Sequence, residues 1–117
     1  MTARFSRKNA GAAVAPTPTD WNVLTGAGAV LCAAHRDQTG NMHGHTWEVT
    51  AWWTGKPDVL QKQAELNSYL SFFDHSILAD SVTLAEDLSR RIAEDLGCER
   101  VDIRRPLERL YAIVEKV

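Results

Sequence analysis

The stretch of sequence that decides the fold is His-Gly-His-Thr-Trp-Glu-Val-Thr-Ala-Trp-Trp-Thr, residues 43–54. β-branched and aromatic residues dominate this stretch, and such residues favour strands. Side chains alternate between the two faces of a strand, so residues 47, 49 and 51 share one face, and residues 48, 50 and 52 share the other. A Gly-Lys-Pro sequence follows at 55–57 and ends the strand. The stretch therefore predicts a strand that begins with two histidines.

A second strand is expected immediately before this one. The segment 30–34 is apolar, which suits a buried strand. The segment 36–42 is polar and carries Gly40, which is typical of a loop. If the two strands form a hairpin, they lie antiparallel and bring His35 beside His43 and His45.

Two helices are expected after the hairpin. The first runs from about Asp58, which can cap it, to about Phe72, with leucines recurring at helical spacing. The second begins with the capping-box pattern Thr83-Leu84-Ala85-Glu86 and closes at Gly97. Leucine and isoleucine recur every four residues in this second helix and predict one apolar face.

Two short strands, 101–105 and 110–117, are expected at the end of the chain, turned around Pro106. The element order is then strand, strand, helix, helix, strand, strand. The economical packing is α+β, with a four-stranded antiparallel sheet and both helices on one face. Residues 1–20 are rich in Ala, Thr and Pro and are expected to form an N-terminal arm, which leaves 21–117 as the single domain.

Composition excludes several classes of protein. The 117 residues carry a formal net charge of −2 and no large basic block, which argues against nucleic-acid binding through phosphate contacts. No apolar run approaches the roughly 20 residues that a membrane span needs. Cys32 and Cys98 follow no paired spacing and fit a reducing, cytoplasmic environment. The N-terminal stretch lacks the leucine-rich centre of an export signal.

Three of the four histidines cluster at the hairpin. His43 and His45 are two residues apart and point to the same face of a strand. If the two strands form a hairpin, His35 lies beside this pair. Three imidazoles then meet at one point and leave a fourth coordination position open, as in catalytic zinc sites. Such a zinc would polarise an oxygen bound to it. The residues alone leave the alternative open that this His-x-His pair is only a surface feature.

Three motifs in the chain resemble, in order, the signature of the 6-pyruvoyl-tetrahydropterin synthase family, which includes the 6-carboxy-tetrahydropterin synthases of the queuosine pathway. They are Ala33-Ala34-His35, His43-Gly44-His45 and Asp74-His75. The resemblance covers about residues 25–117, and all four histidines of the chain fall on the motifs.

The resemblance implies the tunnelling fold, in which subunits pair their sheets into a barrel and form a hexamer, a dimer of trimers. It implies zinc ligands at His35, His43 and His45. It also implies a proton-transfer dyad of Asp74 and His75 that comes from a neighbouring subunit. The implied activity is that of a zinc-dependent carbon–oxygen lyase acting on a reduced pterin.

The chain departs from the family at two places. Thr39 stands where family members carry a proton-abstracting cysteine, and a hydroxyl is far too weak an acid to replace a thiolate without strong activation. Arg104 or Arg105 stands where a glutamate usually accepts hydrogen bonds from the pterin, and arginine can only donate. Glu108 could supply a carboxylate in place of that glutamate if the loop around it has a different conformation from that in family members.

These departures leave two hypotheses. The first is a zinc lyase of pterin metabolism with altered chemistry, in which an arginine in the pocket would favour a more anionic substrate. The second is a non-catalytic pterin- or metabolite-binding protein that keeps the metal site. A weaker third is a structural zinc in a scaffold subunit, which predicts that chelation would dissociate or unfold the oligomer.

Overall fold

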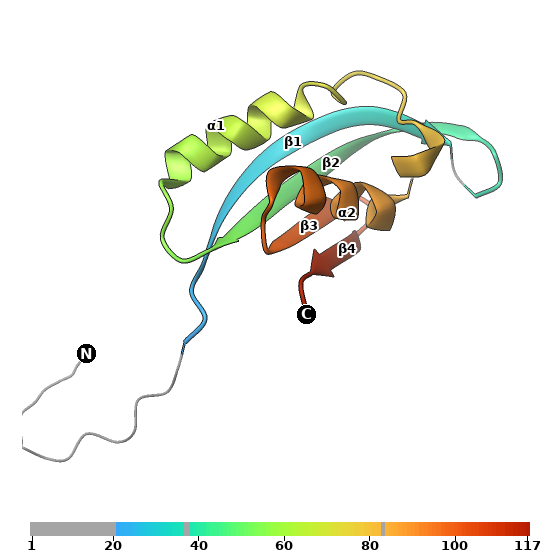
Figure 1. Cartoon of the computed structure of the whole chain (residues 1–117). Helices are drawn as coiled ribbons and strands as arrows, with labels where there is room; N and C mark the ends of the chain where they lie inside the picture. The colour runs from blue at the N-terminus through green and yellow to red at the C-terminus, as the bar shows by residue number, and fades with distance from the viewer. Residues whose placement is uncertain (1–20, 37, 83) are drawn as a thin grey trace, which may run out of the picture.

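A computed structural model describes residues 21–36, 38–82 and 84–117 of the chain (Figure 1). The N-terminal arm expected at 1–20 lies outside these residues. The elements, in chain order, are β1 (Leu24–Arg36), β2 (Met42–Thr54), α1 (Val59–Leu70), the 3-10 helix η1 (Asp80–Val82), α2 (Ala85–Leu96), β3 (Arg100–Arg105) and β4 (Leu110–Glu115). No helix in the described ranges is both long and apolar enough to cross a membrane.

The four strands form one antiparallel sheet in the order β1-β2-β3-β4. The predicted fold class, an α+β arrangement with a four-stranded antiparallel sheet, is confirmed. The first strand is longer than the predicted segment 30–34, because β1 pairs with β2 along its whole length, from Leu24 opposite Thr54 to Arg36 opposite Met42. The Gly/Ala-rich sequence before Val30 therefore continues the strand.

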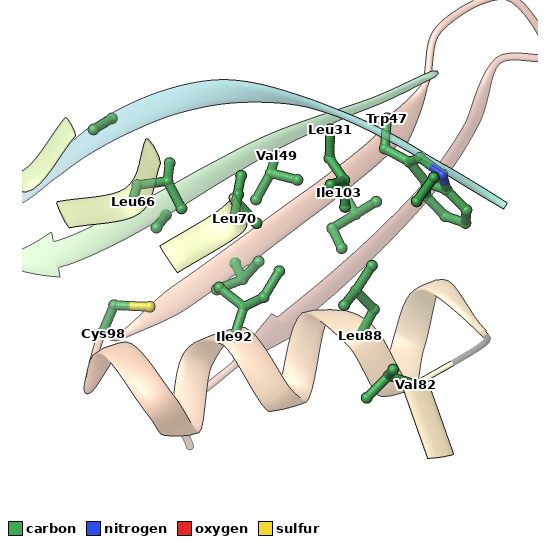
Figure 2. Close-up of a cluster of buried hydrophobic side chains, with 14 of the residues drawn as sticks. Leu31, Trp47, Val49, Leu66, Leu70, Val82, Leu88, Ile92, Cys98 and Ile103 are labelled. Atoms are coloured by element: carbon green, nitrogen blue, oxygen red, sulfur yellow. The ribbon is translucent and has the colours of Figure 1, made fainter. Parts of the chain in front are cut away.

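One hydrophobic core lies between the sheet and the two helices (Figure 2). Odd-numbered side chains of β1, β2 and β3 face this core, as the alternation in 43–54 predicted. Each large side chain buried there contributes about 1.5–3 kcal/mol to stability. The largest fully buried side chains are those of Leu31, Trp47, Val49, Leu66, Leu88, Ile92, Val101 and Ile103. Both helices contribute to this one cluster, so both cover the same face of the sheet.

The first helix has the predicted cap. The carboxylate of Asp58 accepts hydrogen bonds from the backbone N–H groups of Leu60 and Gln61, at 3.1 and 3.2 Å. The helix ends at Leu70, two residues before the predicted Phe72, and the chain turns into the 71–75 segment.

The second helix corrects the prediction of a capping box. Its N-cap is Leu84, which has no side-chain capping bond, and Thr83 lies outside the described residues. A capping box needs the hydroxyl residue at the N-cap and the glutamate three positions later. With Leu84 at the N-cap, Glu86 lies two positions later instead of three, so it does not occupy the glutamate position of a capping box. Gly97 closes the helix as predicted, with a φ of 64°.

The packing of β1 on β2 predicts the effect of two glycine substitutions. A Cβ at Gly26 would lie 2.6 Å from the ring of Trp52, its cross-strand partner, whereas a Cβ at Gly28 would meet only ordinary contacts at 3.6 Å and beyond. Gly26→Ala should therefore lower the free energy of unfolding by about 1–3 kcal/mol. Gly28→Ala, the matched control, should be neutral or stabilising by up to about 1 kcal/mol. Urea unfolding measures both, and equal effects at the two positions would contradict the prediction.

Candidate functional site

Three histidines gather at the end of the β1–β2 hairpin. His35 is directly opposite His43 in the register, and His45 lies two residues further along β2. All three are odd-numbered positions, so they belong to the helix-covered face. The ring centroids of His35 and His45 are 4.8 Å apart, and those of His43 and His45 are 6.0 Å apart. The strand pairing therefore brings the three histidines together, as the sequence predicted.

These imidazoles line a small cavity of about 160 Å³ together with Arg105, here called the histidine cavity. Zinc–nitrogen bonds of about 2.1 Å at tetrahedral angles would hold imidazole centroids roughly 5 Å apart. The His35–His45 spacing of 4.8 Å is close to that value, and the His43–His45 spacing of 6.0 Å is wider. Three imidazoles are a donor set that suits zinc. Among the described residues, however, no three His, Cys, Asp or Glu side chains are arranged to hold a metal ion, so the rings would have to move to bind one.

The surroundings of His45 favour its neutral imidazole. Burial lowers the pKa of His45 below its ordinary value of 6.5, and the nearby Arg105 guanidinium lowers it further. The neighbouring His35 and His43 act on the pKa of His45 in the same direction, while Glu108 opposes them. A metal ion binds the neutral form of histidine, so this environment favours a ligand over a cation.

A larger cavity of about 520 Å³ adjoins the histidine cavity and shares His35 and Arg105 with it. It is here called the large cavity. Its volume lies within the roughly 300–1,000 Å³ of small-molecule sites. Its walls are largely apolar, from Trp47, Leu84, Ile103, Leu110 and Ala112, with polar groups at Gln38, Thr39 and Glu86. Thr39, which the resemblance aligns with a cysteine of the family, therefore lies in the wall of this cavity.

The structure separates the two candidate arginines. Arg105 faces the histidines, and its Nε lies 3.4 Å from a carboxylate oxygen of Glu108. Arg104 is the next residue on the strand, so it faces the opposite side of the sheet and pairs with Glu48 at 3.8 Å. Of the predicted substrate-binding residues, Arg105 and Glu108 therefore lie together near the histidine cavity, and Arg104 does not.

Asp74 and His75 form a hydrogen-bonded pair at the outer edge of β1. One carboxylate oxygen of Asp74 lies 2.8 Å from Nδ1 of His75, and the other accepts a hydrogen bond of 2.9 Å from the backbone N–H of Cys32. The backbone N–H of His75 donates to the carbonyl of Cys32 at 2.5 Å. His75 has a left-handed φ of 55°, and the strand edge holds it in that conformation.

The Asp74–His75 pair adjoins a cavity that one of the three clustered histidines also lines. His75 lines this cavity, of about 510 Å³, with Cys32, Gly44, His45 and Thr46. The sulfur of Cys32 is 3.9 Å from the hydroxyl of Thr46. Both are even-numbered positions, so Cys32 lies on the face opposite to His35, as the strand alternation predicted. The fold thus brings the three histidines together and holds the dyad at the edge of β1, beside a cavity that His45 shares.

Two segments contribute to the large cavity that the sequence analysis did not assign to a site. Trp47 is buried in the core, and Leu84, Ala85 and Glu86 line the cavity. No local signal could have found them, because their place depends on how α2 packs over β3 and β4.

A scan of the sequence against protein-family models finds no match, and neither does a search of curated proteins. Among solved structures, that of 6-pyruvoyl tetrahydropterin synthase from Caenorhabditis elegans is similar, with a TM-score of 0.69. The similarity covers 82% of this chain and 96% of that chain at 16% sequence identity. At such identity the likeness shows a shared fold, and the expected tunnelling fold is confirmed at that level.

The Asp74 carboxylate should make stability depend on acid pH. The hydrogen bond from Cys32, and then that from His75, hold the pKa of Asp74 below its ordinary value of 3.8. A carboxyl group with a depressed pKa stabilises the fold above its unfolded pKa and loses that contribution as the pH falls through the folded pKa. Asp74→Asn should therefore lower the melting temperature at about pH 7, and the gap to the wild type should shrink below pH 3.8. A gap that is the same at both pH values would contradict this origin.

Proposed function

We propose that the chain is a zinc-dependent lyase acting on a reduced pterin, of the 6-pyruvoyl-tetrahydropterin synthase type but with altered chemistry. The observation that carries this proposal is the histidine cavity, where three imidazoles gather beside a cavity large enough for a small molecule. The similarity of the fold to a tetrahydropterin synthase supports the same reading.

His35, His43 and His45 would hold the zinc through neutral ring nitrogens. A zinc held in this way polarises an oxygen of the substrate and makes its neighbouring protons more acidic. The residues of the chain then have two tasks, which are to orient the substrate in the large cavity and to move protons. Arg105 and Thr39 lie in the wall that shares His35 with the metal site, so they are placed to contact the substrate.

The Asp74–His75 pair is suited to proton transfer. The carboxylate holds Nδ1 of the imidazole, which fixes the ring and leaves Nε2 to accept or donate a proton. The His75 side chain is 80% exposed in one chain, so it is accessible to a group on another molecule. We place the complete site at an interface between copies, in a homo-oligomer such as a dimer of trimers.

The loss of the thiolate is the reason to expect altered chemistry. The hydroxyl of Thr39 can donate and accept hydrogen bonds, but it cannot supply the base that a thiolate would provide. A non-catalytic pterin-binding protein that keeps the metal is therefore the second candidate, and Thr39 is the residue that favours it. Both candidates are cytoplasmic in our proposal, since both cysteines are free thiols.

Metal content and turnover together test this function. The purified protein should carry about one zinc per chain, and His43→Ala should lose it, because each nitrogen ligand is needed for a three-histidine site. His43 is exposed, so its removal leaves the core intact. The matched control, His75→Ala, should keep the zinc. Elemental analysis reads the metal, and circular dichroism checks the fold of both variants.

Turnover of dihydroneopterin triphosphate, with and without chelator, separates the two candidates. A zinc-dependent product that His75→Ala abolishes supports the lyase. Stoichiometric zinc with pterin binding but no product supports the binding protein. Protein without zinc, whatever its turnover, would refute the metal site on which the proposal rests. Unfolding on chelation would instead assign the metal a structural role.

A further inference from the structure

The guanidinium of Arg105 lies over the Trp47 ring in the wall of the large cavity. The guanidinium carbon of Arg105 is 5.9 Å from the ring centroid of Trp47, a cation–π contact that holds the guanidinium over the indole. Both residues line the large cavity, and Arg105 also lines the histidine cavity. A group bound by Arg105 would therefore lie within reach of the three histidines.

The Trp47 donor is buried and lacks an acceptor. The side chain is 1% exposed, and its Nε1–H makes no hydrogen bond to any described residue. The Nε1 atoms of Trp52 and Trp53 are likewise buried without a partner, and the Trp47 Nε1 itself is closed to solvent. Trp47 therefore contributes its ring to the wall of the large cavity rather than an accessible donor.

Arg105 has donor capacity left for a ligand. Its side chain is 21% exposed, and its contact with Glu108 is a single Nε–Oε1 approach of 3.4 Å that does not meet hydrogen-bond geometry. The terminal nitrogens of a guanidinium can bind a carboxylate or phosphate with two parallel bonds. The weak contact with Glu108 is one that an anionic ligand could replace.

The start of α2 also lines the large cavity, through Leu84, Ala85 and Glu86. Its first turn carries the carboxylates of Glu86 and Asp87, which offset the partial positive charge of the helix start, so an anion at this end of the cavity depends on Arg105. The carboxylate of Glu86 favours a ligand that carries N–H donors at its other end.

We propose that Arg105, held over the Trp47 ring, forms a subsite for an anionic oxygen substituent, a carboxylate or a phosphate, on a flat ring that occupies the large cavity. The identity of the ring rests on the function proposed above, whereas the anion subsite rests on the guanidinium itself. The apolar walls of Ile103, Leu110 and Ala112 accommodate the faces of such a ring.

Calorimetric titration tests the subsite with three probes, which are pterin-6-carboxylate, its uncharged analogue 6-hydroxymethylpterin, and inorganic phosphate alone. The full-length protein is used as purified and again after chelation, so that binding does not depend on the metal or on turnover. The carboxylate should bind at least about tenfold more tightly than the uncharged analogue, the size of effect expected from a charge-assisted pair. Arg105→Gln should remove that difference, and Arg105→Lys should retain part of it.

Arg104→Gln is the matched control, because Arg104 lies on the opposite face and should leave the discrimination unchanged. The indole N–H resonance of Trp47, assigned with Trp47→Phe, should shift on binding of the carboxylate in the wild type. Equal affinity for the two pterins, or equal effects of the two arginine variants, would overturn the subsite. Phosphate binding that needs Arg105, without binding of either pterin, would support the subsite and refute the pterin as the ring. No binding of any probe would overturn both.

Discussion

The antiparallel pairing of β1 with β2 is the constraint on which the rest of the molecule depends. The two strands are 13 residues each and remain in register from end to end. This register places Leu31 and Trp47 in the core and, further along the same face, sets His35 opposite His43. A slip by one residue would move every side chain of one strand to the other face, so it would destroy the core and the histidine cavity together.

The edge of β1 positions the second group of candidate chemistry. The backbone N–H of Cys32 donates a hydrogen bond to the Asp74 carboxylate, and the backbone carbonyl of Cys32 accepts one from the N–H of His75. The histidine cavity and Arg105 lie on the helix-covered face, and the cavity beside His75 is lined by His45 as well. His45 therefore lies between the cluster of three histidines and the dyad.

The departures of this chain from the tetrahydropterin synthase pattern lie in one place. Thr39 and Arg105 line the same large cavity, beside the shared His35. Replacing a thiolate with a hydroxyl removes a base, and replacing a glutamate with an arginine reverses the charge offered to the ligand. The proposed metal site is thus combined with a pocket of different polarity, and this combination is the basis for proposing a related but altered chemistry.

The sequence by itself determined the order of the elements, the alternation of 43–54 and the grouping of His35, His43 and His45. These follow from local periodicity, and a strand period of two is legible in a single segment. Only the tertiary structure decided which arginine faces the histidines, since β3 had to be placed in register against β2 before Arg104 and Arg105 could be assigned to faces. It also decided that Leu84 is the N-cap of α2, that Trp47 lines a cavity, and that the Asp74–His75 pair is held at the edge of β1. Such features depend on contacts between segments far apart in the chain, and no local pattern encodes them.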